Sequence, residues 1–127
     1  MIAPAWLHAL LVALPLLAAR LSARPKDVAS LGKAAATHGV PPALLVSVCL
    51  HESTLSGRGA WCGALGVPGG ASQPYAAGHA LARWRRRCGS WRGAVALYRH
   101  GRGCRDTDGA EGYPSRVLGF AARLGAR

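Results

Sequence analysis

The segment from residue 42 to residue 53, PALLVSVCLHES, constrains the fold of this chain more than any other feature. Pro41 and Pro42 stand at its start, and proline is favoured in the first turn of a helix. The apolar side chains of such a helix go around most of its circumference instead of lying on one stripe. A helix of that kind has to be covered on all sides, so we expect it to be buried.

The size and composition of the chain allow one globular domain. Its 127 residues suffice for a single core, and an apolar content of 50% is too high for a disordered chain. The formal net charge is +11, from 16 Lys and Arg residues against 5 Asp and Glu residues. Few residues of this chain could therefore serve as catalytic carboxylates.

Other helices are predicted from turn and cap signals. Gly39 is suited to end a first helix, Pro74 and Pro114 to open two others, and Ser90 to cap a fourth. The helices are expected at residues 27–38, 42–53, from 74 to the arginines before Gly89, 90–100 and 114–124, with glycine-rich loops at 54–73 and 101–112. The predicted fold class is all-α, or α+β at most, with short strands around Ala64, Leu65 and Val67.

Residues 5–19, AWLHALLVALPLLAA, carry no formal charge. The run is shorter than the roughly 20 residues of a membrane-spanning helix and is typical of the apolar part of a secretory signal, with Ala19 or Ala23 before the cut. No Lys or Arg precedes the run, and Leu stands two residues before either cut. Residues 1–23 are thus predicted to be a signal peptide or an N-terminal anchor, with a buried helix or a wrongly chosen start as alternatives, and residues 24–127 the domain. The expected location is periplasmic or extracellular.

Four cysteines, an even number, suit an exported domain of this size. They are Cys49, Cys62, Cys88 and Cys104. A helix over 90–100 would hold Cys88 and Cys104 at its opposite ends, beyond the ~7 Å Cα separation that a disulfide allows. The pairing of Cys49 with Cys62 and Cys88 with Cys104 is therefore the least expected, and Cys62 with Cys104 is preferred because both flank loops. A buried free thiol is the alternative for Cys49.

No metal or cofactor site is expected, because the chain has no C-x-x-C motif and no histidine pair at ligand spacing. The best candidate for chemistry is Glu52, which stands at the end of the buried helix. A charge at the edge of a core is costly unless it is used or paired, and burial favours the protonated carboxyl group that a general acid needs. The structural alternative is an ion pair with one of the many cations. Asp106, Asp108 and Glu111 are expected to be solvated in the second loop.

In this order along the chain, several segments resemble the lytic transglycosylase family, which has a lysozyme-like fold. They are LVSVCLHES at 45–53, GALGV at 63–67, Gly78 to Leu81 followed by Trp84, YRHGRG at 98–103, and Tyr113 with Val117. The resemblance covers about residues 27–120. Where the family usually has Met-Gln this chain has Pro68-Gly69, and where it has Asn-Ala this chain has Arg99-His100. Gln73 is the candidate to supply the missing amide.

The resemblance implies a carbon–oxygen lyase that cleaves peptidoglycan. Glu52 would protonate the glycosidic oxygen between N-acetylmuramic acid and N-acetylglucosamine. It would then take the proton of the muramic 6-hydroxyl, which closes a 1,6-anhydro ring. Ser53 and Tyr98 would orient Glu52 and the sugar, and Val67, Gln73 and Tyr113 are the further substrate-binding candidates. Glycosidases that use water need two facing carboxylates, so the scarcity of acids agrees with a mechanism that uses one.

The expected partners are peptidoglycan glycan strands and anionic cell-envelope polymers, with a monomeric protein and no nucleic acid. The densest basic residues are Arg83, Arg85, Arg86, Arg87 and Arg92. They are interpreted as solvated cations or as a means of attraction to the anionic wall. A nucleic-acid interface is disfavoured because no reading motif accompanies the arginines. The alternative function is a non-catalytic, cationic wall-binding protein on a decayed transglycosylase fold.

Overall fold

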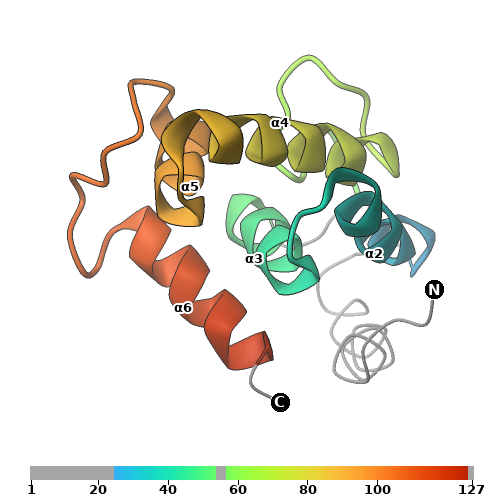
Figure 1. Ribbon diagram of the computed structural model, residues 1–127. Helices are drawn as coiled ribbons and strands as arrows, with labels where there is room; N and C mark the ends of the chain where they lie inside the picture. Colours follow the sequence, from blue (N-terminus) through green and yellow to red (C-terminus); the bar gives the residue numbers. More distant parts are fainter. Residues whose placement is uncertain (1–24, 54–56, 126–127) are drawn as a thin grey trace.

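The computed structural model describes residues 25–53 and 57–125, and Figure 1 shows the arrangement of their helices. These are α2 (Pro25–His38), α3 (Pro42–Glu52), α4 (Ser72–Cys88), α5 (Trp91–His100) and α6 (Tyr113–Gly125). The described residues contain no strand, so the all-α expectation is confirmed and the short strands expected in the 60–70 region are wrong. That region consists of turns and bends. The predicted signal peptide or anchor, residues 1–23, lies outside the described residues.

Helix α3 is covered by its neighbours, as the sequence predicts. Every residue from Ala43 to Cys49 is buried, and α3 packs against α2, α4 and α6. Figure 1 shows it in the middle of the assembly, with α4 crossing above it and α6 below. Fully burying a side chain such as Leu45 stabilises the fold by about 1.5–3 kcal/mol. The core therefore fixes the direction of α3, and with it the position of Glu52 at its end.

A tight turn joins α4 to α5. Gly89 ends α4 in the left-handed conformation with φ 78°, and the Ser90 hydroxyl then accepts a hydrogen bond from the Gly93 N–H at 3.0 Å. Both features are the predicted ones. They let α5 fold back against α4, and these two helices form the most extensive helix pair of the described fold.

The disulfides correct the predicted pairing. Cys49 is bonded to Cys62, and Cys88 to Cys104, with Cα separations of 4.0 and 5.4 Å. The preferred Cys62–Cys104 pair and the free thiol at Cys49 are both wrong.

The reason for the error is the path of the chain after α5. Gly101 has φ 68°, and the residues after it run back along the helix. A Cβ atom on Gly93 would lie 2.8 Å from Cβ of Cys88 and 3.1 Å from the carbonyl oxygen of Cys104. Both cysteines therefore lie beside the first turn of α5. The length of α5 alone does not reveal this return of the chain, which brings Cys104 back to Cys88.

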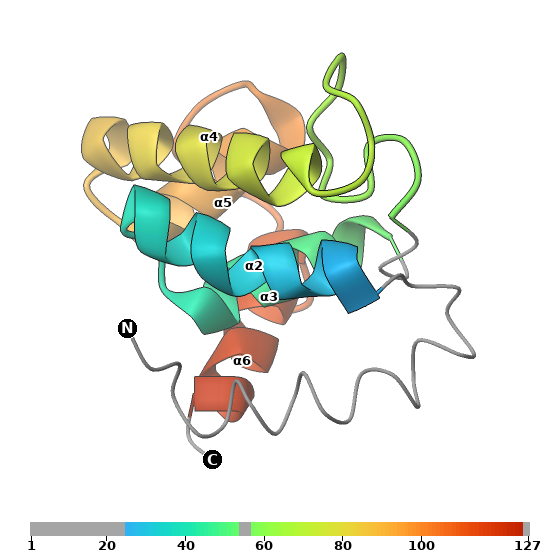
Figure 2. The same cartoon turned by 90° about the vertical axis from the view of Figure 1, so that its right-hand side faces the viewer.

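None of the helices in residues 25–53 and 57–125 is long and apolar enough to span a membrane. Figure 2 shows that residues 57–71 lie at the end of the molecule where α3 ends and α4 begins. The loop is therefore placed beside Glu52.

Candidate active site

Glu52 is the last residue of α3 and is half-buried. Its Oε1 atom accepts a hydrogen bond of 2.6 Å from the hydroxyl of Tyr113, the first residue of α6. Tyr113 is buried, so its hydroxyl has a fixed position. A residue 61 positions further along the chain thus orients the carboxyl group.

Gly63 forms the other wall of the Glu52 site. A Cβ atom at this position would lie 2.9 Å from Cδ of Glu52 and 3.0 Å from its Oε2. The residue also has φ +85°, which a side chain would strain. The Cys49–Cys62 disulfide joins the preceding residue to α3. Glycine is therefore required here for its backbone conformation and because a side chain would collide with the Glu52 carboxyl group.

Tyr98, on α5, holds the loop and does not bond Glu52. Its hydroxyl donates a hydrogen bond to the carbonyl oxygen of Cys62. Burial, and then the negative charge of Glu52, raise the pKa of Tyr98 above its ordinary value of 10.0. The hydroxyl therefore stays protonated and remains a donor. The expectation that Tyr98 orients Glu52 is corrected, because Tyr113 makes that bond.

The environment of Tyr113 also keeps its hydroxyl protonated. Burial contributes most to raising the pKa of Tyr113, followed by the hydrogen bond to Glu52 and the charges of Glu52 and Tyr98. Arg99 lowers the pKa in part, and its guanidinium carbon lies 5.1 Å from the centroid of the Tyr113 ring. Tyr113 thus acts as a fixed hydrogen-bond donor to Glu52, next to an exposed cation.

Gln73 is fully buried and organises the loop. Its Oε1 accepts from the backbone N–H groups of Cys62 and Ala64, each at 3.2 Å. Its Nε2 donates to the carbonyl oxygens of Ala64 and Val67, each at 2.9 Å, and at 3.4 Å to that of Pro68. Its amide is therefore engaged by the protein. The expectation that Gln73 contacts the sugar is corrected to a structural role.

The two remaining candidates are Ser53, which directly follows Glu52, and Val67, which lies in the loop. The backbone N–H of Ser53 donates to the carbonyl oxygen of Cys49 at 3.1 Å, and its hydroxyl donates to the same oxygen at 3.5 Å. Val67 is half-buried, and its carbonyl oxygen is taken by Gln73. Substrate contact by Ser53 and Val67 stays a prediction.

A buried contact behind the site fixes α6 against α3. The hydroxyl of Ser47, on α3, donates to the carbonyl oxygen of Val117, on α6, at 2.7 Å. Nδ1 of His51 lies 2.7 Å from the Ser47 carbonyl oxygen, and its ring packs edge-on against Tyr113 and Phe120. Ser47 is not among the residues that the sequence predicts for the site. The signal that could identify Ser47 is its hydroxyl group in an otherwise apolar helix. A buried hydroxyl group needs a hydrogen-bond partner, and a neighbouring helix can supply it.

The other acids of the described chain do not join the site. Asp106 accepts a hydrogen bond from Arg92 at 2.7 Å and another from the backbone N–H of Asp108. Asp108 and Glu111 are exposed on the same loop. Among the contacts between described residues, none links these three acids to Glu52 or its tyrosines. Glu52 is therefore the carboxylate around which the site is built.

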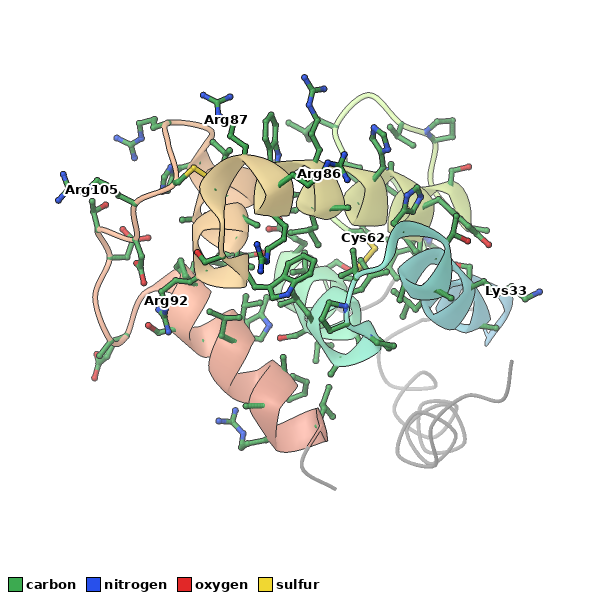
Figure 3. The ribbon with its side chains drawn as sticks, viewed as in Figure 1. Lys33, Cys62, Arg86, Arg87, Arg92 and Arg105 are labelled. Atoms are coloured by element: carbon green, nitrogen blue, oxygen red, sulfur yellow. A yellow bond between two sulfur atoms is a disulfide. The ribbon has the colours of Figure 1, made fainter. Side chains whose placement is uncertain are left out.

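The basic residues lie mostly on the outer faces of the helices, and Figure 3 labels several of them. Arg83 and Arg87 stack over Trp84 at 5.3 and 5.7 Å, and Arg85 over Trp91 at 5.6 Å. After α5 a hollow of about 240 Å³ is lined by His100, Arg102, Gly103, Arg105 and Thr107. In the described residues, no group of three or more His, Cys, Asp or Glu is placed to hold a metal ion.

Comparison of the chain with protein-family models, with curated proteins and with solved structures finds no significant match.

Proposed function

We propose that this protein is a peptidoglycan lytic transglycosylase with a lysozyme-like fold, in which Glu52 acts first as general acid and then as general base. One observation carries the proposal. A half-buried carboxyl group stands at the end of the central helix, with one oxygen held by Tyr113 and the other on the side where the backbone of Gly63 approaches closely without a side chain. The order of the segments that resemble the family adds to it.

The proposed reaction consumes no water. Protonated Glu52 donates its proton to the glycosidic oxygen as the bond to C1 of N-acetylmuramic acid breaks. The carboxylate then takes the proton of the muramic 6-hydroxyl, whose oxygen forms a new bond to C1. The products are a strand that ends in a 1,6-anhydro ring and a strand with a free 4-hydroxyl, and Glu52 is protonated again. The substrate's acetamido group stabilises the positive charge that develops at C1.

The division between the two carboxyl oxygens supports these roles. Tyr113 donates to Oε1, so Oε2 is the atom proposed to exchange the proton. Gly63 leaves the space beside Oε2 free of a side chain. A hydrolase would need a second carboxylate at about 5–5.5 or 6.5–9.5 Å from the first. The three acids of the 101–112 loop have their contacts elsewhere, which favours the transglycosylase over the hydrolase.

We also propose that the protein is exported and acts as a monomer in the cell envelope. Its two disulfides suit an oxidising compartment. Both disulfides lie within the folded domain, and the Cys49–Cys62 bond contributes directly to the site. Export would bring the enzyme to its proposed substrate, the glycan strands of the wall.

The variant Glu52→Gln tests the function. Gln keeps the volume and can still accept the hydrogen bond from Tyr113, but it cannot donate and recover a proton. General acid–base catalysis contributes about 10²–10⁴-fold to a rate, so loss of both roles should bring release of 1,6-anhydro products from purified sacculi to background. Mass spectrometry of the released fragments and circular dichroism of the variant measure product and fold. Product release by a folded Glu52→Gln variant would refute the proposal.

Changing Asp106, Asp108 and Glu111 to their amides gives the matched control. Each variant should keep its activity, because the proposed nucleophile is the 6-hydroxyl of the substrate. An essential acid in this loop, together with products that end in a reducing sugar, would instead indicate a two-carboxylate hydrolase.

The second candidate is a cationic wall-binding protein without activity. Two observations favour it: the amide of Gln73 is engaged by the loop, and arginines stacked on tryptophans cover the end of α4. Binding of the unaltered protein to sacculi without release of any fragment would support this alternative.

A further inference from the structure

Arg99 is an exposed cation that the structure places next to the Glu52 site. It lies on α5, directly after Tyr98, at the position where the resembling family has Asn. Its guanidinium group stacks over the ring of Tyr113, whose hydroxyl donates to Glu52. One aromatic ring and one hydrogen bond therefore separate the guanidinium from the proposed general acid.

Stacking on the ring leaves the donors of Arg99 available. The guanidinium carbon lies over the Tyr113 ring, 5.1 Å from its centroid, and a cation–π contact of this kind does not use the N–H donors of the fork. Among the described residues no carboxylate contacts Arg99. The ring also limits the freedom of the side chain, which lowers the entropic cost of binding a ligand. The arrangement suits a planar anion that accepts two parallel hydrogen bonds, and a carboxylate is such an anion.

The proposed substrate offers one carboxylate close to the bond that is cleaved. N-acetylmuramic acid carries a lactyl group on the same sugar ring whose C1 is attacked. In strands with peptide stems the lactyl carboxyl forms an amide and has no charge. After removal of the stem it is a free carboxylate, whereas the carboxylates of an intact stem begin at its second residue, further from the sugar.

We propose that Arg99 binds the free lactyl carboxylate of peptide-free glycan strands, and that the protein acts on these strands in preference to strands that carry stems. This inference rests on the proposed function, since it names the form of the substrate. It explains why an arginine at this position is useful in a chain that otherwise retains the acid and both tyrosines of the site. Arg99 is thus a residue that determines specificity.

The experiment compares three preparations of glycan strands: strands with intact stems, strands freed of stems by an amidase, and freed strands whose lactyl carboxylate has been converted to an uncharged amide. The unaltered protein should have its highest kcat/KM on the free carboxylate, about 10-fold or more above the amide, as is typical of hydrogen bonds to charged groups. Arg99→Gln should lose this difference, and Arg99→Lys should keep part of it. Equal rates on the carboxylate and the amide, or faster cleavage of strands with stems, would overturn the inference.

Arg123 provides a matched control for the loss of one charge. Its guanidinium also stacks over an aromatic ring, that of Phe120, at 5.7 Å, but it lies in the last turn of α6. Arg123→Gln should therefore retain the preference for the carboxylate strands. If it loses the preference to the same extent as Arg99→Gln, general attraction between the basic protein and the strands is responsible, and the inference fails.

Binding to the Glu52→Gln variant separates this inference from the proposed function. Calorimetry should show tighter binding of the free carboxylate strands than of the amide strands, and the Glu52→Gln/Arg99→Gln double variant should bind the two equally. This result supports the role of Arg99 even if the unaltered protein cleaves nothing. If the Glu52→Gln variant binds the carboxylate and amide strands equally while the unaltered protein is fully active, the proposed role of Arg99 is wrong and the transglycosylase proposal stands.

Discussion

The protein has two glycine-rich loops that a disulfide ties to helices, and they are held in different ways. Residues 57–71 are fixed from inside, by the buried amide of Gln73 and by the buried Trp61, whose indole N–H donates to the Gly70 carbonyl oxygen at 2.8 Å. Residues 101–112 are fixed at the surface, by contacts such as the pair of Arg92 with Asp106. Of these two described loops, the first lies against Glu52, through Gly63. Two loops of similar composition therefore have different roles, because buried contacts fix the first beside Glu52 and the second is held by contacts nearer the surface.

The largest expected effect is that of Gln73→Ala. It removes the partners of two backbone N–H groups and of carbonyl oxygens in the first loop, and an unsatisfied buried polar group costs about 1–3 kcal/mol. The free energy of unfolding should fall by about 3 kcal/mol or more, with loss of activity. Denaturant titration measures this fall in the free energy of unfolding. A loss below about 1 kcal/mol would mean that the amide is dispensable and that the two loops are held alike.

Removing each disulfide in turn should sharpen the contrast. The bonds span 13 and 16 residues, so chain entropy predicts a similar loss for each, about 3 kcal/mol. The Cys49→Ser/Cys62→Ser variant should also lose activity, because Gly63 is no longer fixed against Glu52. Cys88→Ser/Cys104→Ser should remain active at temperatures where it is folded. Equal activities of the two folded variants would contradict the assigned roles.

A pair of glycine variants isolates the contact with Glu52. Gly63 and Gly109 both have positive φ, 85° and 76°, so alanine should cost each loop about 1 kcal/mol through the backbone. The added Cβ meets Glu52 only at residue 63, whereas nothing lies within 4 Å of it at residue 109. Gly63→Ala should therefore lose activity and Gly109→Ala should keep it. Equal turnover of sacculi by the two variants would show that the space next to Oε2 is not needed.

The smallest effect is expected for Asp106→Asn. The Arg92 side chain is 50% exposed and the Asp106 side chain 12%, and ion pairs with one partner open to water contribute about 0–1 kcal/mol. The midpoint of thermal unfolding should fall by about 4 °C at most in low salt and by less in high salt, without a change in activity. A loss comparable to that of Gln73→Ala would remove the distinction between the loops.

The sequence predicts much of this fold, because local chemistry decides where helices begin and end. Pro42, Ser90 and Gly101 stand at such boundaries, and the burial of α3 follows from its composition. The position of Glu52 at the end of α3 also follows from the sequence.

The contacts between distant segments could not be predicted in the same way. The Cys88–Cys104 bond depends on the return of the chain after α5, and the choice of Tyr113 over Tyr98 depends on how α6 packs against α3. Gln73 gives no signal of its role, since its partners are backbone groups, which every loop has.

The burial of Trp61 gives the first loop an optical reporter of its own. Its side chain is 1% exposed, and the residue immediately precedes the disulfide-bonded Cys62. Trp84, in α4, and Trp91, the first residue of α5, are only partly buried and stack with arginines. With Trp84, Trp91 and also Trp6 replaced by Phe, Trp61 is the remaining tryptophan. A red shift of its indole emission would then record entry of water into the loop, while far-ultraviolet dichroism follows the helices. The two signals, recorded together, would show whether the wall of the Glu52 site opens before the domain unfolds.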